Sequence, residues 1–308
     1  MGYGSYTAAD WSKLQSSRNI TCTSSASELF KQRQSIDKFN PKFINMRESC
    51  DSDDSPESTP VIIGFDVTGS MGYLAEEIAS NALNETILHM MDKQPVSNPH
   101  VLVAAIGDSK SDAAPLQVTQ FEADIRIVEQ LLDLYLEGRG GGNGGESYHL
   151  AWYFADKHTK TDAYTKRQAK GFLFTVGDEP CHLNLTSDEI ARVFGDKAPN
   201  MSSTDLYKAV SEKYETFHII MSGRGRNIAE VQGNWESIIG KRYAILPADR
   251  VDCLSEVITT IMQVAQGADL NQVLNQWDSA DGTRDVVAAA IATVDFTSKG
   301  GKKKHLFF

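Results

Sequence analysis

Short apolar runs alternate with longer segments of helical spacing from residue 60 onward. The runs have the length and composition of buried strands, and they lie at 61–65, 101–106, 171–176, 217–221 and 243–246. The intervening segments predict helices at 73–92, 123–137, 147–157, 202–214, 228–239 and 251–265. Because strands that alternate with helices form a parallel sheet with both faces covered, the pattern predicts an α/β fold.

The expected architecture is a doubly wound, mainly parallel sheet with helices on both faces. A shorter run at 116–119 is expected to form an antiparallel edge strand. We expect one domain of this kind at 60–267, preceded by an N-terminal extension and acidic linker at 1–59. A C-terminal extension at 268–308 is expected to carry helices at 271–277 and 284–292 and to end in a basic tail.

Composition narrows the classes of function. The 308 residues are 41% hydrophobic and 23% charged, which is enough to bury one substantial core. The net charge of −11 argues against a general surface for nucleic acid or anionic membrane, so we expect neither as a partner. The four cysteines are widely separated and form no Cys-x-x-Cys pair, as is typical of reduced cytosolic thiols. The chain has no apolar run of roughly 20 residues and no secretory signal, so we expect a cytoplasmic protein.

Oxygen-bearing side chains follow the first predicted strand. Asp66, Thr68 and Ser70 occupy the first, third and fifth positions of the turn Asp-Val-Thr-Gly-Ser. Side chains at this spacing can converge on one point, and their oxygens suit Mg²⁺ or Mn²⁺ better than a thiol-seeking metal. The turn therefore predicts half of a site for a hard cation.

The other half is expected from two further segments. Asp178 follows the predicted strand at 171–176, and in a parallel sheet the carboxyl ends of the strands share one edge. The glycine-rich loop 138–147 precedes a predicted helix and offers Asn143, Glu146 and Ser147 as oxygen donors. We expect Asn143 to be the ligand from this loop, with Glu146 and Ser147 as alternatives.

These residues resemble the metal-ion-dependent adhesion site of the von Willebrand factor A (VWA) family. That site combines an Asp-x-Ser-x-Ser turn, a hydroxyl from a second loop and an Asp from a third. Asp66, Thr68 and Ser70 match the turn, with Thr in place of the first Ser, and Asp178 matches the third loop. The resemblance covers about 60–267 and implies a Rossmann-like fold. The segments 69–72 and 177–182 are most similar to the intracellular branch found in bacterial, phage and kinase-linked proteins.

The second loop departs from the family. Gly-Gly-Asn-Gly-Gly-Glu, at 141–146, stands where the family has Gly-Gly-Thr, so Asn143 would replace the threonine. The resemblance implies an incomplete metal shell with one position open for an Asp or Glu of a protein partner. It thus predicts a non-enzymatic, Mg²⁺- or Mn²⁺-dependent adaptor. The members of this family that the chain resembles often work beside AAA+ ATPases or protein kinases, which suggests the class of partner.

Other interpretations use the same residues differently. Asp66 could be a helix cap and nothing more, and Thr68, Ser70 and Asp178 could be ordinary turn residues without a ligand. A metal-dependent hydrolase could use Glu146 or Glu179 as a base, and a phage or bacterial particle could use the site for assembly alone. Nucleotide binding is disfavoured, because Glu146 stands where a phosphate-binding loop needs lysine.

Overall fold

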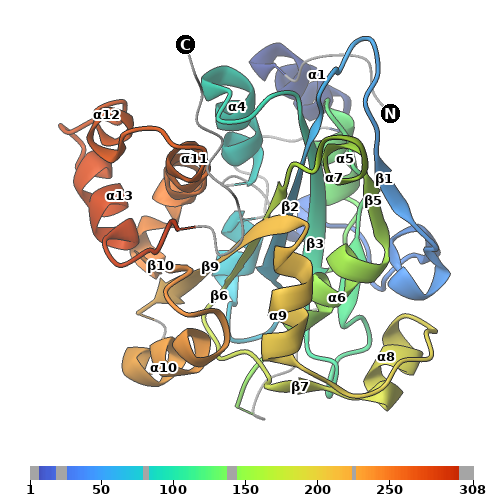
Figure 1. Ribbon diagram of the computed structural model, residues 1–308. Helices are drawn as coiled ribbons and strands as arrows, with labels where there is room; N and C mark the ends of the chain where they lie inside the picture. Colours follow the sequence, from blue (N-terminus) through green and yellow to red (C-terminus); the bar gives the residue numbers. More distant parts are fainter. Residues whose placement is uncertain (1–6, 19–25, 79–82, 137–143, 224–226, 298–308) are drawn as a thin grey trace.

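The structure, a computed structural model, describes residues 7–18, 26–78, 83–136, 144–223 and 227–297. At its centre is a six-stranded sheet with the order β10-β9-β6-β2-β3-β4 (Figure 1). The strands are β2 (Thr59–Asp66), β3 (Pro99–Ile106), β4 (Leu116–Val118), β6 (Gly171–Gly177), β9 (Tyr214–Ser222) and β10 (Tyr243–Pro247). Strand β4 pairs antiparallel with β3, and the other neighbouring pairs are parallel. The mixed α/β class, the mostly parallel sheet and the antiparallel edge strand are confirmed.

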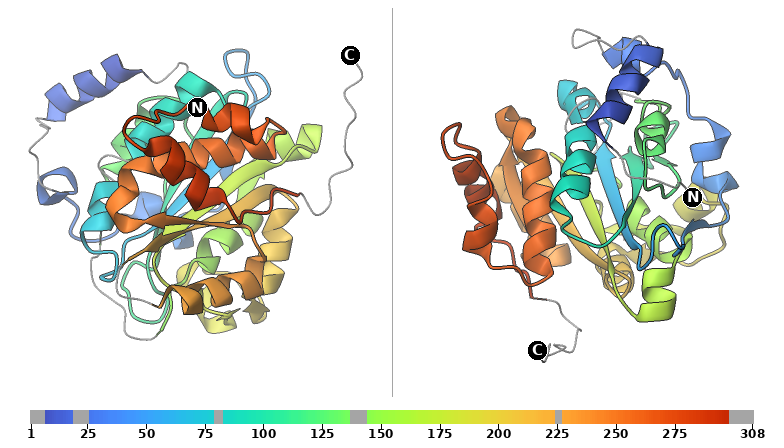
Figure 2. Two further views of the ribbon diagram at one scale, coloured as in Figure 1. Left: turned by 90° about the vertical axis from the view of Figure 1, so that its left-hand side faces the viewer. Right: turned by 90° about the horizontal axis from the view of Figure 1, so that it is seen from above.

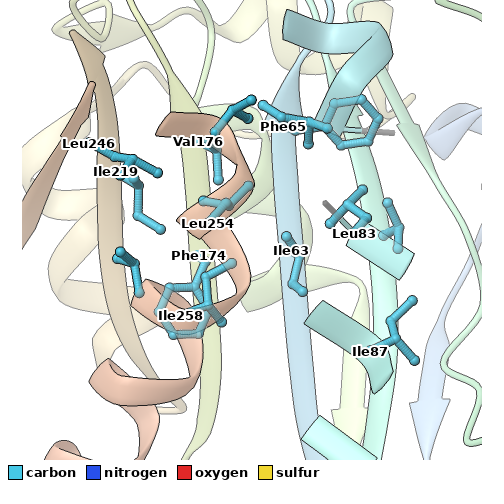
Figure 3. Close-up of a cluster of buried hydrophobic side chains, with 14 of the residues drawn as sticks. Ile63, Phe65, Leu83, Ile87, Phe174, Val176, Ile219, Leu246, Leu254 and Ile258 are labelled. Carbon is cyan, nitrogen blue, oxygen red and sulfur yellow. The ribbon is translucent and has the colours of Figure 1, made fainter. Parts of the chain in front are cut away.

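The sheet is covered on both faces, which explains why its strands read as continuous apolar runs. On one face, Ile63 and Phe174 pack with helices α4 (Leu83–Lys93) and α11 (Leu254–Ala265) (Figure 3). On the other face, Ile62 and Leu173 belong to a second cluster with Trp152 and Trp235. These two tryptophans lie on α6 (His149–Lys157) and α10 (Ile228–Ile239). Successive strand residues point to opposite faces, so each strand contributes to both apolar layers.

The strand order reverses at β2. This strand pairs with β3 on one side and with β6 on the other, and β6 enters the chain only after β3 and β4. The carboxyl ends of β2 and β6 are therefore neighbours, although more than a hundred residues separate them in sequence. Such a reversal leaves a crevice at the carboxyl edge, where open parallel sheets bind their ligands.

Most of the predicted helices are present with changed bounds. The segment predicted at 73–92 contains α3 (Tyr73–Glu77) and α4, separated by residues outside the described ranges. The predicted helix at 202–214 is α9 (Ser203–Ser211). The predicted helix at 251–265 corresponds to α11, which starts three residues later because a 3₁₀ helix, Ala248–Cys253, precedes it. The helices at 228–239 and 147–157 are α10 and α6.

The helix predicted at 123–137 is too long. Helix α5 spans only Arg126–Leu131. Beyond it, the buried Gln117 side chain accepts a hydrogen bond from the Tyr135 backbone N–H (3.0 Å) and donates one to the Tyr135 carbonyl (2.7 Å). Both backbone groups that a longer helix would use are thus bonded to strand β4 instead.

Several short elements carry too weak a periodicity to be predicted. They are β1 (Arg47–Ser49), which pairs with β5 (Thr159–Thr161), β7 (Asn184–Leu185), which pairs with β8 (Met201–Ser202), and helices α7 (Asp162–Arg167) and α8 (Ser187–Val193).

The acidic linker is held against the domain by polar contacts. Asp51 forms an ion pair with Arg167, and the Ser49 and Ser55 hydroxyls lie 3.0 and 2.8 Å from the two ring nitrogens of His100.

Both terminal segments contain helices (Figure 2). The N-terminal segment forms α1 (Ala8–Arg18) and α2 (Ala26–Leu29). After α11, the chain forms α12 (Leu270–Leu274) and α13 (Thr283–Ile291), and Trp277 and Val287 join the apolar layer around α11. The basic tail at 298–308 lies outside the described residues. No helix in the described ranges combines the length and apolar character needed to cross a membrane.

Candidate functional site

Asp66 ends strand β2 at the carboxyl edge of the sheet and is fully buried. Its Oδ1 accepts hydrogen bonds from the Thr68 backbone N–H (2.8 Å) and the Thr68 hydroxyl (2.6 Å). Its Oδ2 accepts a hydrogen bond from the Tyr148 hydroxyl (2.7 Å). The turn that follows the strand is therefore built around this carboxylate, and both of its oxygens are held in place.

Ser70 connects this turn to Asp178. The Ser70 hydroxyl donates to Asp178 Oδ1 at 2.9 Å, and it lies 3.2 Å from the Thr68 hydroxyl. Asp66, Thr68, Ser70 and Asp178 thus form one continuous chain of close polar contacts across the ends of β2 and β6. The structure brings together four of the five residues that the sequence predicted. The fifth, Asn143, lies outside the described residues.

Tyr148 is a member of this site that the sequence did not indicate. It lies directly before α6, and its ring is buried. Its hydroxyl reaches Asp66 because Gly177, at the end of β6, has no side chain: a Cβ there would collide with the Tyr148 hydroxyl. A glycine at the end of a buried strand is a weak sequence signal for such a close approach. The sequence does not show which side chain approaches the glycine, and only the folded structure identifies it as Tyr148.

Glu146 is also buried beside the site, with 1% of its surface exposed. Its backbone N–H donates to the Pro180 carbonyl (2.8 Å), and its carbonyl accepts from the His182 N–H (3.1 Å). These bonds fix the end of the glycine-rich loop against the loop that carries Asp178. The Glu146 Oε2 atom is buried and accepts no hydrogen bond from the residues that the structure describes.

Ser147 faces a different network. Its hydroxyl donates to Asp108 Oδ1 (3.0 Å) and accepts from the Ser109 backbone N–H (2.9 Å). Asp108 follows strand β3, is fully buried, and has the His182 Nε2 atom at 3.0 Å. The Lys110 ammonium lies 3.1 Å from the other nitrogen of that ring. Ser147 therefore stabilises the loop after β3, next to the predicted site.

The electrostatics of the site favour protonated acids. Burial raises the pKa of Asp66 to about 7, and the nearby Asp178 charge adds to this, whereas the bonds from Thr68 and Tyr148 oppose it. Burial, followed by the charges of Asp66 and Asp108, raises the pKa of Glu146 to about 10. These carboxyls are thus too close together, and too far from water, to ionise easily. A bound cation would relieve both effects.

The donor set fits a hard cation such as Mg²⁺ or Mn²⁺. Carboxylate and hydroxyl oxygens are the ligands that these ions prefer. The buried Cys181 thiol lies in the same loop as Asp178, but burial raises its pKa to about 12, which disfavours a thiolate ligand. In the described ranges, no three or more His, Cys, Asp or Glu side chains already form a group that could hold a metal ion. The predicted set differs from such a group because two of its described members, Thr68 and Ser70, are hydroxyls.

The chain has a distant likeness to a solved structure of known name. No protein-family model and no curated protein matches the chain. Among solved structures, the pilus adhesin SpaC from Lactobacillus rhamnosus GG in its open conformation is similar over 70% of this chain and 31% of the adhesin, with 8% identity and a TM-score of 0.42. A second structure of that adhesin gives 9% identity and a TM-score of 0.41, over 70% and 32% of the two chains. The chain thus spans about a third of the adhesin, and a likeness at this level carries no argument about function.

Proposed function

We propose that the chain is a VWA-like adaptor that uses a divalent cation to bind a carboxylate of a protein partner. The observation that carries this proposal is the chain of close polar contacts from Asp66 through Thr68 and Ser70 to Asp178. It lies at the carboxyl edge, at the point where the strand order reverses. Two distant turns have no structural need to place two buried acids together, so the arrangement favours a ligand over simple helix capping.

The topology supports the finer assignment of the fold. The strand order, with an antiparallel strand at one edge and a reversal at β2, supports the assignment to a doubly wound, Rossmann-like sheet. The expected position of a VWA cation site is the carboxyl end of the first core strand, and Asp66 ends β2. We therefore propose a VWA-like fold, because the strand order and the position of Asp66 both agree with it.

Asp66, Thr68, Ser70 and Asp178 would hold the cation, with a further oxygen from the second loop, where the sequence predicted Asn143. A bound Mg²⁺ would supply the positive charge that the buried acids need and a coordination position for an outside oxygen. The chain's own part is to hold the oxygens in register, through β2, β6 and the bonds among the side chains. A partner Asp or Glu suits the open position; an AAA+ ATPase or a protein kinase in the cytoplasm is the partner class that the resemblance suggests.

Metal binding and partner capture test this proposal at two levels. Isothermal titration of the full chain with Mn²⁺ should show one site, which Asp66→Ala abolishes and Asp53→Ala, at an exposed linker position, preserves. Affinity capture followed by mass spectrometry should recover a partner with Mg²⁺ and lose it in EDTA or with Asp66→Ala. A partner held equally well in EDTA would contradict the proposal.

The hydrolase alternative needs an ionised base beside the site. The raised pKa of Glu146 keeps that carboxyl protonated near neutral pH in the absence of a cation, and Glu179 is buried. A phosphatase and esterase screen with Mn²⁺ separates the two functions. Turnover that Asp66→Ala abolishes would favour the enzyme.

A further inference from the structure

We propose that Glu146 is the oxygen ligand that the second loop contributes to the cation. This inference rests on the proposed function, because it concerns the same site. It assigns to the glutamate the place that a threonine hydroxyl has in the family that the chain resembles. The consequence is a site with a third carboxylate, contributed by Glu146 in addition to Asp66 and Asp178.

The first argument is the unmet hydrogen-bonding capacity of Glu146. Only 1% of the surface of the Glu146 residue is exposed and its Oε2 atom is buried, yet Oε2 accepts no hydrogen bond from the described residues. A buried polar atom without a partner keeps the full cost of its lost hydration, so such an atom calls for a specific explanation. A cation at this place would provide it.

The second argument is where Glu146 is held. Its backbone bonds to Pro180 and His182 fix it beside the loop that begins at Asp178. The charge that affects its carboxyl most strongly, after burial, is that of Asp66. Glu146 therefore lies at the end of the second loop, beside the loop that begins at Asp178, and its carboxyl feels the charge of the acid that ends β2.

The third argument is that the neighbouring donors are already engaged. The Ser147 hydroxyl is bonded to Asp108 and Ser109, and the Tyr148 hydroxyl donates to Asp66. Each serves the protein scaffold. Among the described residues of the second loop, Glu146 is thus the one with a side-chain oxygen left for a ligand.

The acids are not gathered around one point in this structure. That is expected of buried carboxyl groups that keep their protons, because nothing draws their oxygens to one point until a cation displaces those protons. A third carboxylate raises the affinity for divalent cations, because affinity at oxygen sites increases with the number of charged ligands. The cation would then be retained by this chain before a partner arrives.

Mn²⁺ binding to the full chain tests the assignment directly. Glu146→Gln keeps the size of the side chain and removes its charge, and it should weaken Mn²⁺ binding about 10- to 100-fold, as measured by isothermal titration or by the electron paramagnetic resonance signal of free Mn²⁺. Glu122→Gln is the matched control, because Glu122 is a buried glutamate beside Arg126, at the β3 edge of the sheet, and should leave the affinity unchanged.

Thermal unfolding separates a ligand from a merely structural residue. In EDTA near neutral pH, Glu146→Gln should unfold at or above the wild-type temperature, because it removes a buried acid that costs stability there, whereas the increase in Tm caused by Mn²⁺ should be smaller. If Glu146→Gln does not fold, Glu146→Asp retains the charge on a shorter side chain, and it should bind Mn²⁺ more weakly than the wild type because the carboxylate is displaced from the cation.

The outcomes distinguish this inference from the proposed function. Unchanged Mn²⁺ affinity in the folded glutamate variant, together with loss of binding in Asp66→Ala, would overturn the role of Glu146 and leave the adaptor proposal standing. A wild-type chain that binds no Mn²⁺ would overturn both. Equal loss of Tm with and without Mn²⁺ would show that Glu146 is structural, and would also overturn the inference.

Discussion

The cation-free protein should lose stability as the pH rises from 5 to 7, and Asp66 should be a principal cause. Its carboxyl has a pKa of about 7 in the folded chain, against an ordinary value of 3.8. Between these two values the folded state keeps a proton that the unfolded state has released. Stability from this group is therefore complete below about pH 3.8 and is lost as the pH rises through 7.

The size of the effect follows from the pKa shift. Each pH unit over which the folded state holds one extra proton changes the free energy of unfolding by about 1.4 kcal/mol. From pH 5 to pH 7, Asp66 should thus cost about 2 kcal/mol, because the folded group is itself half-ionised at pH 7. Glu146, with a pKa of about 10, acts in the same direction and extends the decline to higher pH.

Urea unfolding in EDTA at pH 5, 6, 7 and 8 measures this dependence. The comparison is between the wild type and Asp66→Asn, which has a similar size and no titrating proton at this position. The difference between the two slopes gives the contribution of Asp66 together with its effect on the pKa of Glu146. Adding Mn²⁺ should stabilise the wild type more at pH 8 than at pH 5, because protons compete with the cation for the carboxylates.

Identical pH dependence in the wild type and Asp66→Asn would refute the reasoning. It would mean that the Asp66 carboxyl is ionised across this range, so that its hydrogen bonds from Thr68 and Tyr148 outweigh its burial. The electrostatic argument for a cation would then lose its basis, although the geometry of the site would remain.

Three further substitutions test the scaffold of the site by urea unfolding. Gly177→Ala should destabilise the fold by about 1 to 3 kcal/mol, because the new methyl group collides with the Tyr148 hydroxyl; a stability equal to the wild type would contradict the close packing there. Tyr148→Phe should cost about 1 to 3 kcal/mol at pH 8 and less at pH 5, since the hydrogen bond to Asp66 is strongest when the acid is charged; equal losses at both pH values would argue against it. Gln117→Ala should cost about 1 to 3 kcal/mol by leaving the backbone of Tyr135 unpaired, and no loss would mean that another group replaces the glutamine.

The sequence by itself determined the class of the fold and the local half of the site. Five parallel strands and their edge strand could be predicted because a strand buried on both faces leaves an uninterrupted apolar run. The turn around Asp66 could be predicted because its contacts span only two to four residues. The hydrogen bonds from Thr68 and the approach of Ser70 are set by that short spacing.

Only the tertiary structure decided which distant residues complete the site. Asp178 meets Ser70 because β6 pairs with β2, and this pairing depends on the order in which the strands assemble. Tyr148 reaches Asp66 through the space left by Gly177, a contact between three separate segments that no local pattern encodes. Helix α5 likewise ends where it does because Gln117, from strand β4, bonds to the backbone of Tyr135.

The choice among the second-loop donors shows the physical reason most clearly. In the sequence, Glu146 and Ser147 are adjacent polar residues, and either could supply the oxygen ligand from the second loop. In the fold, Ser147 is bonded to Asp108, whereas Glu146 is buried with an oxygen that the described residues leave unbonded. Periodicity and turn chemistry act over a few residues, but burial and hydrogen-bond satisfaction depend on everything that packs around a side chain, and these quantities exist only once the chain has folded.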